Sequence, residues 1–205
     1  LGTFTARGAD WPRWRGPDLN GISAEKGWQT QWPAEGPKQL WKASIGTGFA
    51  SFSVSGGRVY TMGNNNNTDS VFCLDAQTGK VVWKHSYPCP LDAKNFEGGP
   101  CATPTVVDGQ VYTFSRKGDV FCLDAAKGTV VWSKNLNQEL GLAIPTWGCA
   151  SSALVEGAMV VLNMGSAGVA LDRKSGNVVW VSAKSAGAYA TPVPLKLGAE
   201  RCLAI

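Results

Sequence analysis

The feature that most constrains this chain is a segment that occurs three times. It reads VFCLDAQTGKVVWKHS at 71–86, VFCLDAAKGTVVWSKN at 120–135 and GVALDRKSGNVVWVSA at 168–183. Its tryptophans, Trp83, Trp132 and Trp180, are 49 and 48 residues apart. Because a repeat at this period folds as one supersecondary unit that stacks on its neighbours, the unit determines the architecture.

Each unit reads as four short strands. A hairpin-like segment precedes each copy at a nearly constant distance, at 51–63, 103–115 and 152–165. In the middle unit, the apolar runs 105–107 and 111–114 flank a tight turn at Asp108-Gly109, and two further runs follow after polar turns. An isolated meander leaves an apolar face exposed, and stacking several around an axis buries it. The sequence therefore predicts an all-β chain, a β-propeller of four-stranded antiparallel blades.

The repeat also predicts the domain organisation. We expect an N-terminal extended segment over 1–37 and a partial propeller over 38–205. The propeller divides into a ring-closing outer strand with Trp41 (38–46), three blades (48–86, 100–135 and 148–183) and the first hairpin of an incomplete blade (188–205). At about 48 residues a blade, this is about half of a seven- or eight-bladed ring. The missing C-terminal half is then a required partner, because an open ring has unpaired edges.

Composition excludes several classes of function. Only 17% of the 205 residues are charged and 44% are hydrophobic, which argues against disorder. The net charge of +4 comes from scattered Lys and Arg, so we expect no nucleic-acid partner. No apolar stretch is long enough for a transmembrane helix. The one histidine, His85, excludes a His-rich metal site, and we expect it to be a solvated residue of an outer strand.

The polar and aromatic residues of the repeat are expected to be structural. Each copy has an aspartate that opens a turn, a glycine that closes it and a tryptophan that wedges between blades. Residues repeated in every blade lie on a ring and do not converge on one site. The set comprises Asp75, Gly79, Trp83, Asp124, Gly128, Trp132, Asp172, Gly176 and Trp180.

The repeats LDAQTGKVVW, LDAAKGTVVW and LDRKSGNVVW resemble the pyrroloquinoline quinone (PQQ) repeat of eight-bladed propellers. The segments DWPRWRGPDLNGIS (10–23) and TWGCASSALVEG (146–157) are similar to secreted bacterial PQQ-binding-like proteins labelled alcohol or polyvinyl alcohol dehydrogenase-like. The resemblance covers residues 10–205. It implies a periplasmic or extracellular location. It also implies either a PQQ dehydrogenase or a non-catalytic scaffold similar to the lipoprotein of the outer-membrane β-barrel assembly machinery.

Two departures from the family pattern favour the scaffold. The family's alcohol dehydrogenases typically stack PQQ under a disulfide between adjacent cysteines and hold Ca²⁺ with a Glu/Asn/Asp set. This sequence has no Cys-Cys pair, and its acidic residues outside the repeated turns form no recognisable set. We therefore expect a propeller that binds a ligand, a protein or a polysaccharide. The alternative is the propeller portion of a PQQ-dependent alcohol dehydrogenase, with PQQ and Ca²⁺ bound only by the complete protein.

The starts of the first strands share the pattern x-(Phe/Cys/Tyr)-Ala-(Ser/Thr). They are 48–51, 100–103, 148–151 and 188–191. Small and hydroxyl residues suit a crowded axis, where a hydroxyl can bond to a backbone group. The alternative is a ligand site around the funnel, lined by Trp147, Cys149, Cys101 and Tyr189, in which Trp147 supplies a stacking surface for a planar cofactor.

The cysteines suggest two rival disulfides. A Cys89–Cys101 bridge would staple the long connection between the first two blades, whereas Cys101–Cys149 would join two strands at the axis. Cys73 and Cys122 occupy equivalent positions and are expected to be buried. The run of asparagines at 64–67 is expected to form a flexible exposed turn.

Overall fold

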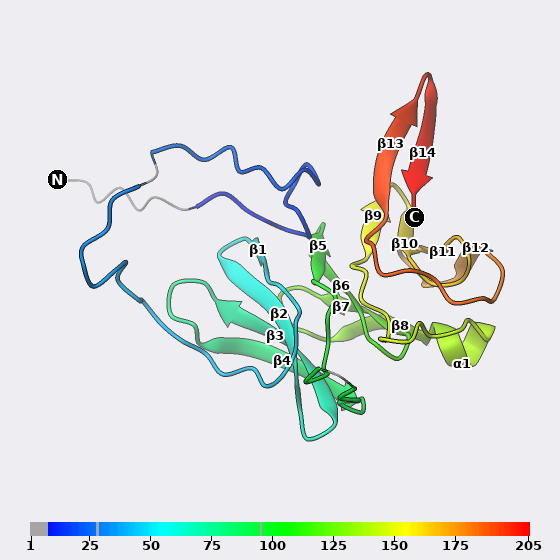
Figure 1. Cartoon of the computed structure of the whole chain (residues 1–205), viewed down its shortest axis with the longest axis horizontal. Coiled ribbons are helices and arrows are strands. Elements are labelled where there is room, and N and C mark those ends of the chain that lie inside the picture. The colour runs from blue at the N-terminus through cyan, green and yellow to red at the C-terminus, as the bar shows by residue number, and fades with distance from the viewer. Residues whose placement is uncertain (1–7, 28, 95) are drawn as a thin grey trace.

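The computed structural model describes residues 8–27, 29–94 and 96–205, and it contains three four-stranded antiparallel sheets followed by a hairpin (Figure 1). The first sheet has β1 (Ser53–Ser55), β2 (Arg58–Asn65), β3 (Thr68–Asp75) and β4 (Val81–Pro88). The second has β5 (Thr105–Val107), β6 (Gln110–Phe114), β7 (Asp119–Asp124) and β8 (Val130–Asn135), followed by helix α1 (Leu136–Leu140). The third has β9 (Leu154–Glu156), β10 (Met159–Leu162), β11 (Val169–Asp172) and β12 (Val178–Val181), and the hairpin has β13 (Val193–Leu197) and β14 (Glu200–Ala204).

Strand order within each sheet follows the chain, so each sheet is a meander. This confirms the predicted all-β chain of four-stranded propeller blades. A β-bulge recurs where the outer strand pairs with the third strand, next to the repeated tryptophan. Opposite that tryptophan lies a small residue, Cys73, Cys122 or Ala170 in the three blades.

The repeated tryptophans join neighbouring blades. The indole Nε1–H of Trp83 donates to the carbonyl of Ala125 at 2.9 Å, and that of Trp132 donates to Arg173 at 3.0 Å. Trp41 makes the same bond to Ala76 in the first blade at 3.0 Å. Thus Trp41 contacts the first blade as an outer-strand tryptophan would.

The segment that carries Trp41 forms no strand in the described part of the chain. Directly after this segment, Thr47 forms an isolated bridge to Asn64 of β2, in which the two residues exchange N–H···O bonds of 2.8 and 2.7 Å. The ring-closing role of residues 38–46 stays a prediction.

The repeated aspartate and glycine form the turn that receives the indole ring. Asp124 Oδ1 accepts the backbone N–H groups of Ala126 and Lys127 at 2.9 and 2.8 Å, and the equivalent carboxylates make similar bonds. Gly128 closes this turn with φ at +71°, and a Cβ there would lie 2.5 Å from the Trp83 ring. The glycine is therefore required both by its backbone conformation and by the ring that covers it.

We expect Gly128→Ala to lower the free energy of unfolding by about 3 kcal/mol, since it adds a steric clash to the strain of a positive φ. Gly109→Ala is the matched control. Gly109 has φ at +74°, but a Cβ there meets nothing within 4 Å, so we expect a loss of about 1 kcal/mol. Urea unfolding of both variants measures the difference. Equal losses would show that the Trp83 contact carries no stability.

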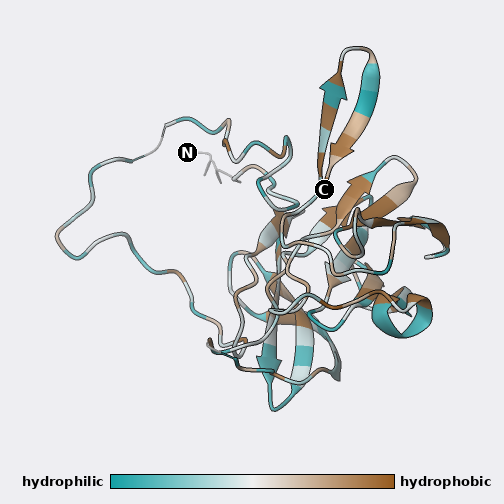
Figure 2. Ribbon diagram, turned by 45° about the vertical axis from the view of Figure 1, so that its right-hand side comes forward, coloured by the Kyte–Doolittle hydropathy of each residue, from teal (hydrophilic) through white to brown (hydrophobic). Residues whose placement is uncertain are grey.

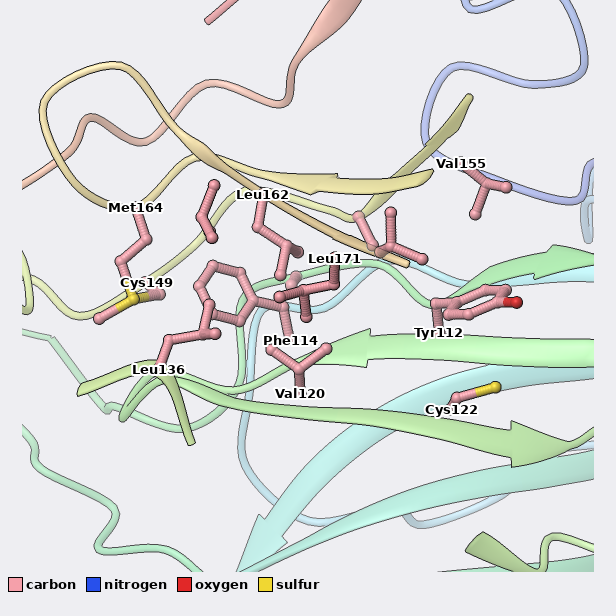
Figure 3. Close-up of a cluster of buried hydrophobic side chains, with 14 of the residues drawn as sticks. Tyr112, Phe114, Val120, Cys122, Leu136, Cys149, Val155, Leu162, Met164 and Leu171 are labelled. Atoms are coloured by element: carbon pink, nitrogen blue, oxygen red, sulfur yellow. The ribbon is translucent and has the colours of Figure 1, made fainter. Parts of the chain in front are cut away.

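The apolar core lies between the blades. Its largest cluster joins the second and third sheets and includes Tyr112, Phe114, Leu162 and Leu171 (Figure 3). A second cluster joins the first two sheets around Met62 and Trp83. Figure 2 shows the hydrophobic colour concentrated in the strands, whereas α1 is mainly hydrophilic. Burial between meanders is what makes their stacking favourable.

The N-terminal segment lies along the inner edges of two blades. Trp11 and Val54 of β1 exchange backbone bonds of 2.8 and 2.9 Å, and the N–H of Val106 in β5 donates to Pro12 at 2.8 Å. Leu19 packs against a third cluster, around β10 and β11. The chain then makes a wide loop before it returns to β1 (Figure 1). Of the segment predicted to be extended, residues 1–7 and 28 lie outside the described residues.

Three local expectations need correction. Asn64 is only 3% exposed because its amide donates to Asp69 Oδ1 and to the Cys89 carbonyl, so the asparagine run is not wholly an exposed turn. His85 is half-buried against Phe121, with ring centroids 4.8 Å apart, because the neighbouring blade covers it. All six cysteines are free thiols in the structure, which forms neither proposed bridge, while Cys73 and Cys122 are buried as expected.

Candidate functional site at the axis and the loop face

Hydroxyl groups connect neighbouring blades at the starts of the inner strands. The backbone N–H of Thr103 donates to Ser152 Oγ at 2.9 Å, and the N–H of Ser152 donates to Thr191 Oγ1 at 2.9 Å. Both bonds join a side-chain hydroxyl to a backbone N–H group, as expected for hydroxyl residues at a crowded axis. In the third blade Ser152 makes the bond, one residue after the position given by the pattern, while Ser151 Oγ is buried without a partner.

A small cavity of about 160 Å³ lies beside these hydroxyls. Cys101 and Tyr189 are among its lining residues, together with Trp14 of the N-terminal segment. Trp14 was missed by the sequence reasoning. The available signal was the cluster DWPRW, in which two large apolar residues occur in an otherwise polar segment.

The four candidate residues do not converge on this cavity. Cys149 is buried, and burial raises the pKa of its thiol to about 12. Trp147 is not among the lining residues and is 40% exposed. Its backbone N–H donates to Tyr189 Oη at 3.2 Å. Tyr189 therefore links the cavity, which it lines with Cys101, to Trp147 outside it, whereas Cys149 is buried and does not line the cavity.

Trp147 and Tyr189 belong to a larger arrangement, which we call the aromatic row: Phe49, Phe96, Trp147 and Tyr189. The ring centroids of Phe49 and Phe96 are 5.5 Å apart, and those of Phe96 and Trp147 are 6.2 Å apart, both edge to face. Each residue comes from a different connection that leads into a blade. The row thus crosses successive blade junctions on the loop face, meaning the side where these connections lie.

Arg116 holds two of these connections together. Its side chain is 1% exposed and lies in the turn between β6 and β7. Its guanidinium donates to the carbonyls of Leu91, Asp92 and Trp147 at 3.1, 3.4 and 3.0 Å, and it stacks on Phe96 at 4.9 Å. Because guanidinium is planar with several donors, it can join both connections at once.

Charges gather beside the buried arginine. Asp92 is 2.6 Å from Lys117, 3.5 Å from Lys94 and 3.8 Å from Arg116. The Lys117 ammonium lowers the pKa of the Asp92 carboxyl through a hydrogen bond and its charge. Three cations thus surround one carboxylate next to Phe96.

A second carboxylate, Asp69 in β3 of the first blade, is fully buried. Asp69 accepts a 2.6 Å bond from Asn64 and lies 3.5 Å from the Tyr87 hydroxyl. Burial raises the pKa of Asp69, although bonds from Asn64, Cys89 and Tyr87 and the charge of Arg116 act in the opposite direction.

This pKa predicts how stability depends on pH. The unfolded chain loses the Asp69 proton near the ordinary value of about 3.9, while the folded protein keeps it to higher pH. Stability is therefore fully present below the unfolded pKa and falls as pH rises through the folded pKa. We expect Asp69→Asn to remove this decline, as measured by urea unfolding between about pH 4 and 7.

Asp75→Asn is the control with the opposite sign. The Thr78 hydroxyl lowers the pKa of the partly exposed Asp75, so the stabilisation from Asp75 is present at neutral pH and is lost as pH falls. A decline that persists in Asp69→Asn would mean that another group causes it.

Comparison with known proteins identifies the family of this chain. Residues 24–195 match the PQQ-repeat family model described as outer membrane protein assembly factor BamB. The chain belongs to this PQQ-repeat family. No curated protein matches the chain significantly.

Solved structures of PQQ-repeat proteins share the fold. They include a europium-containing methanol dehydrogenase (TM-score 0.56, 19% identity, 70% of this chain and 26% of that one). BamB from Moraxella catarrhalis has a TM-score of 0.50 and 19% identity, over 67% of this chain and 41% of that one. Quinohemoprotein alcohol dehydrogenase from Comamonas testosteroni has a TM-score of 0.51 and 22% identity, over 67% and 21%. The chain thus spans less than half the length of each.

Among the described residues, those that line the axial cavity do not by themselves fit the PQQ and Ca²⁺ pair suggested by the family's dehydrogenases. The lining residues of the axial cavity include no carboxylate, and Ca²⁺ requires several oxygen ligands, usually with carboxylates among them. Its volume is also below the roughly 300 Å³ of small ligand pockets. Among the described residues, no group of three or more His, Cys, Asp and Glu side chains could hold a metal ion. In the same part of the chain, no helix is long and apolar enough to cross a membrane.

Proposed function

We propose that this PQQ-repeat chain is part of a binding propeller of the bacterial cell envelope, periplasmic or extracellular, that captures a protein or glycan on its loop face. The observation that carries the proposal is the aromatic row. Phe49 is 55% exposed, Trp147 40% and Tyr189 42%, although each side chain is large and apolar or amphipathic. Contiguous exposed aromatic surface of this kind is characteristic of recognition sites.

The family and the solved relatives support an envelope location, because the matched family model is described as an outer membrane assembly factor.

The test uses the complete protein that carries this chain. The protein is immobilised, and retention of material from a cell-envelope extract is compared among the wild type, Phe49→Ala/Trp147→Ala and Val131→Ala. Val131 is exposed on the outer strand β8 and belongs to none of the connections that carry the aromatic row. We expect the double variant to lose retention and Val131→Ala to keep it. Equal retention by all three would contradict the proposal.

The alternative is the propeller portion of a PQQ-dependent alcohol dehydrogenase. It predicts that the complete protein, given PQQ and Ca²⁺, reduces an artificial electron acceptor when an alcohol is added. Dye reduction that survives Phe49→Ala/Trp147→Ala would favour the dehydrogenase and count against a loop-face binding role.

A further inference from the structure

The aromatic row lies next to a local excess of positive charge. Lys94 is 59% exposed at its side chain and Lys117 33%, while one carboxylate, Asp92, contacts both lysines and Arg116. Arg116 also stacks on Phe96, which places the charges beside the middle of the row. Lys94, Arg116 and Lys117 exceed Asp92 and the exposed Glu97 of the same connection by one positive charge, so the surface combines ring faces and edges with a small excess of positive charge.

We propose that the loop face binds an acidic polysaccharide, a polymer of uronic-acid-type sugars. Its sugar rings lie against the aromatic row, and its carboxylates pair with Lys94 and Lys117. This rests on the proposed binding function and names the class of partner. Sugar rings have apolar C–H faces that pack on aromatic rings, and their carboxylates complement the positive charge.

The row is held in place before any ligand arrives. The N–H groups of Phe49 and Ala50 both donate to the Pro100 carbonyl, at 2.8 and 2.9 Å. Gly99 is packed so closely that a Cβ would lie 2.5 Å from the Thr47 carbonyl oxygen. Arg116 fixes the connection that carries Trp147. Binding therefore requires little ordering of these connections, which favours affinity.

The loop face is less suited to binding an extended peptide. One way in which an extended peptide binds is by adding a strand to a free sheet edge. The inner edges of β1 and β5 already bond to Trp11 and Pro12 of the N-terminal segment. The exposed row itself offers ring surfaces, which suits a polymer of sugar rings.

The test is calorimetric titration of the complete protein with polygalacturonate in low salt. We expect binding that weakens with added salt, because charges contribute. Trp147→Ala should weaken it about tenfold, the equivalent of losing one good aromatic contact. Lys94→Gln/Lys117→Gln should weaken binding and flatten its salt dependence. Val131→Ala, on the perimeter, should leave affinity unchanged.

Two further polymers separate the contributions. Methyl-esterified polygalacturonate keeps the sugar rings and loses the charge, and poly-L-glutamate keeps the charge and loses the rings. We expect both to bind at least tenfold more weakly than polygalacturonate. Equal binding of the methyl ester would overturn the role of the lysines, and equal binding of poly-L-glutamate would overturn the polysaccharide in favour of an acidic peptide.

Failure of this inference is distinguishable from failure of the proposed function. If polygalacturonate does not bind, but Phe49→Ala/Trp147→Ala still abolishes retention of envelope material, the loop face binds a partner of another class. If neither polygalacturonate binding nor row-dependent retention is observed, both proposals are wrong.

Discussion

Replacing Trp132 by alanine is expected to lower the free energy of unfolding by about 4 kcal/mol, as large-to-small changes at buried aromatic positions do. Trp132 is 8% exposed and packs against Tyr112, with ring centroids 6.1 Å apart. Its ring also covers Gly176, where a Cβ would lie 2.8 Å away. The variant loses this packing and leaves the Arg173 carbonyl without its 3.0 Å indole bond.

Trp147→Ala is the matched control, because it removes the same side chain from an exposed position. We expect it to cost less than about 1 kcal/mol, since much of the ring already contacts water. Urea unfolding followed by circular dichroism measures both variants. If the two losses are equal, the tryptophans do not hold the blades together in the way the structure indicates.

The repeat made the fold predictable because each of its conserved-spacing residues has a role within its own blade or in the contact with the next blade. The Asp124 turn, the positive φ of Gly128 and the indole of Trp83 recur with the same spacing in each blade. Three copies of one pattern also reveal the register of the strands. For these residues, sequence spacing and spatial contact carry the same information.

The loop face could be predicted only in part, because its residues occur once and meet through long-range contacts. Tyr189 was identified from the pattern at the strand starts and Trp147 as a tryptophan outside the repeated outer-strand position, and the two are neighbours. Arg116 was not identified, since nothing in its turn sequence indicates that a charged side chain is buried. Trp14 had a signal in the cluster DWPRW, but its place beside the cavity depends on the long-range bonds of Trp11 and Pro12 to two separate blades.

His85 and Asn64 illustrate a related limit. Their strand positions were visible in the sequence, but the partners that cover them come from another blade or another connection. Phe121 lies against His85, and the carbonyl of Cys89 accepts a bond from Asn64. Burial at a blade interface depends on the neighbour as well as on the strand itself.

Replacing Arg116 by methionine is expected to cost about 3 kcal/mol of unfolding free energy. Replacing a buried ion pair by apolar residues is often neutral when both partners are changed. Here the partners of the guanidinium are mainly the carbonyls of Leu91, Asp92 and Trp147, which remain in place. Each carbonyl that loses its buried donor costs roughly 1 kcal/mol.

The residues in which Arg116→Met increases amide exchange show whether Arg116 joins the two connections or only contributes to core packing. We expect amide hydrogen exchange in Arg116→Met to increase in residues 91–99 and 145–149, the two connections that Arg116 joins, and to change little in β2 and β3. Lys117→Met is the control, since Lys117 is partly exposed and forms an ion pair with Asp92 at the surface, worth under about 1 kcal/mol. Faster exchange spread evenly over all blades would contradict a specific link between the connections, and so would equal losses in both variants. Because Arg116 positions Phe96 and Trp147, the same variant should also weaken binding at the aromatic row.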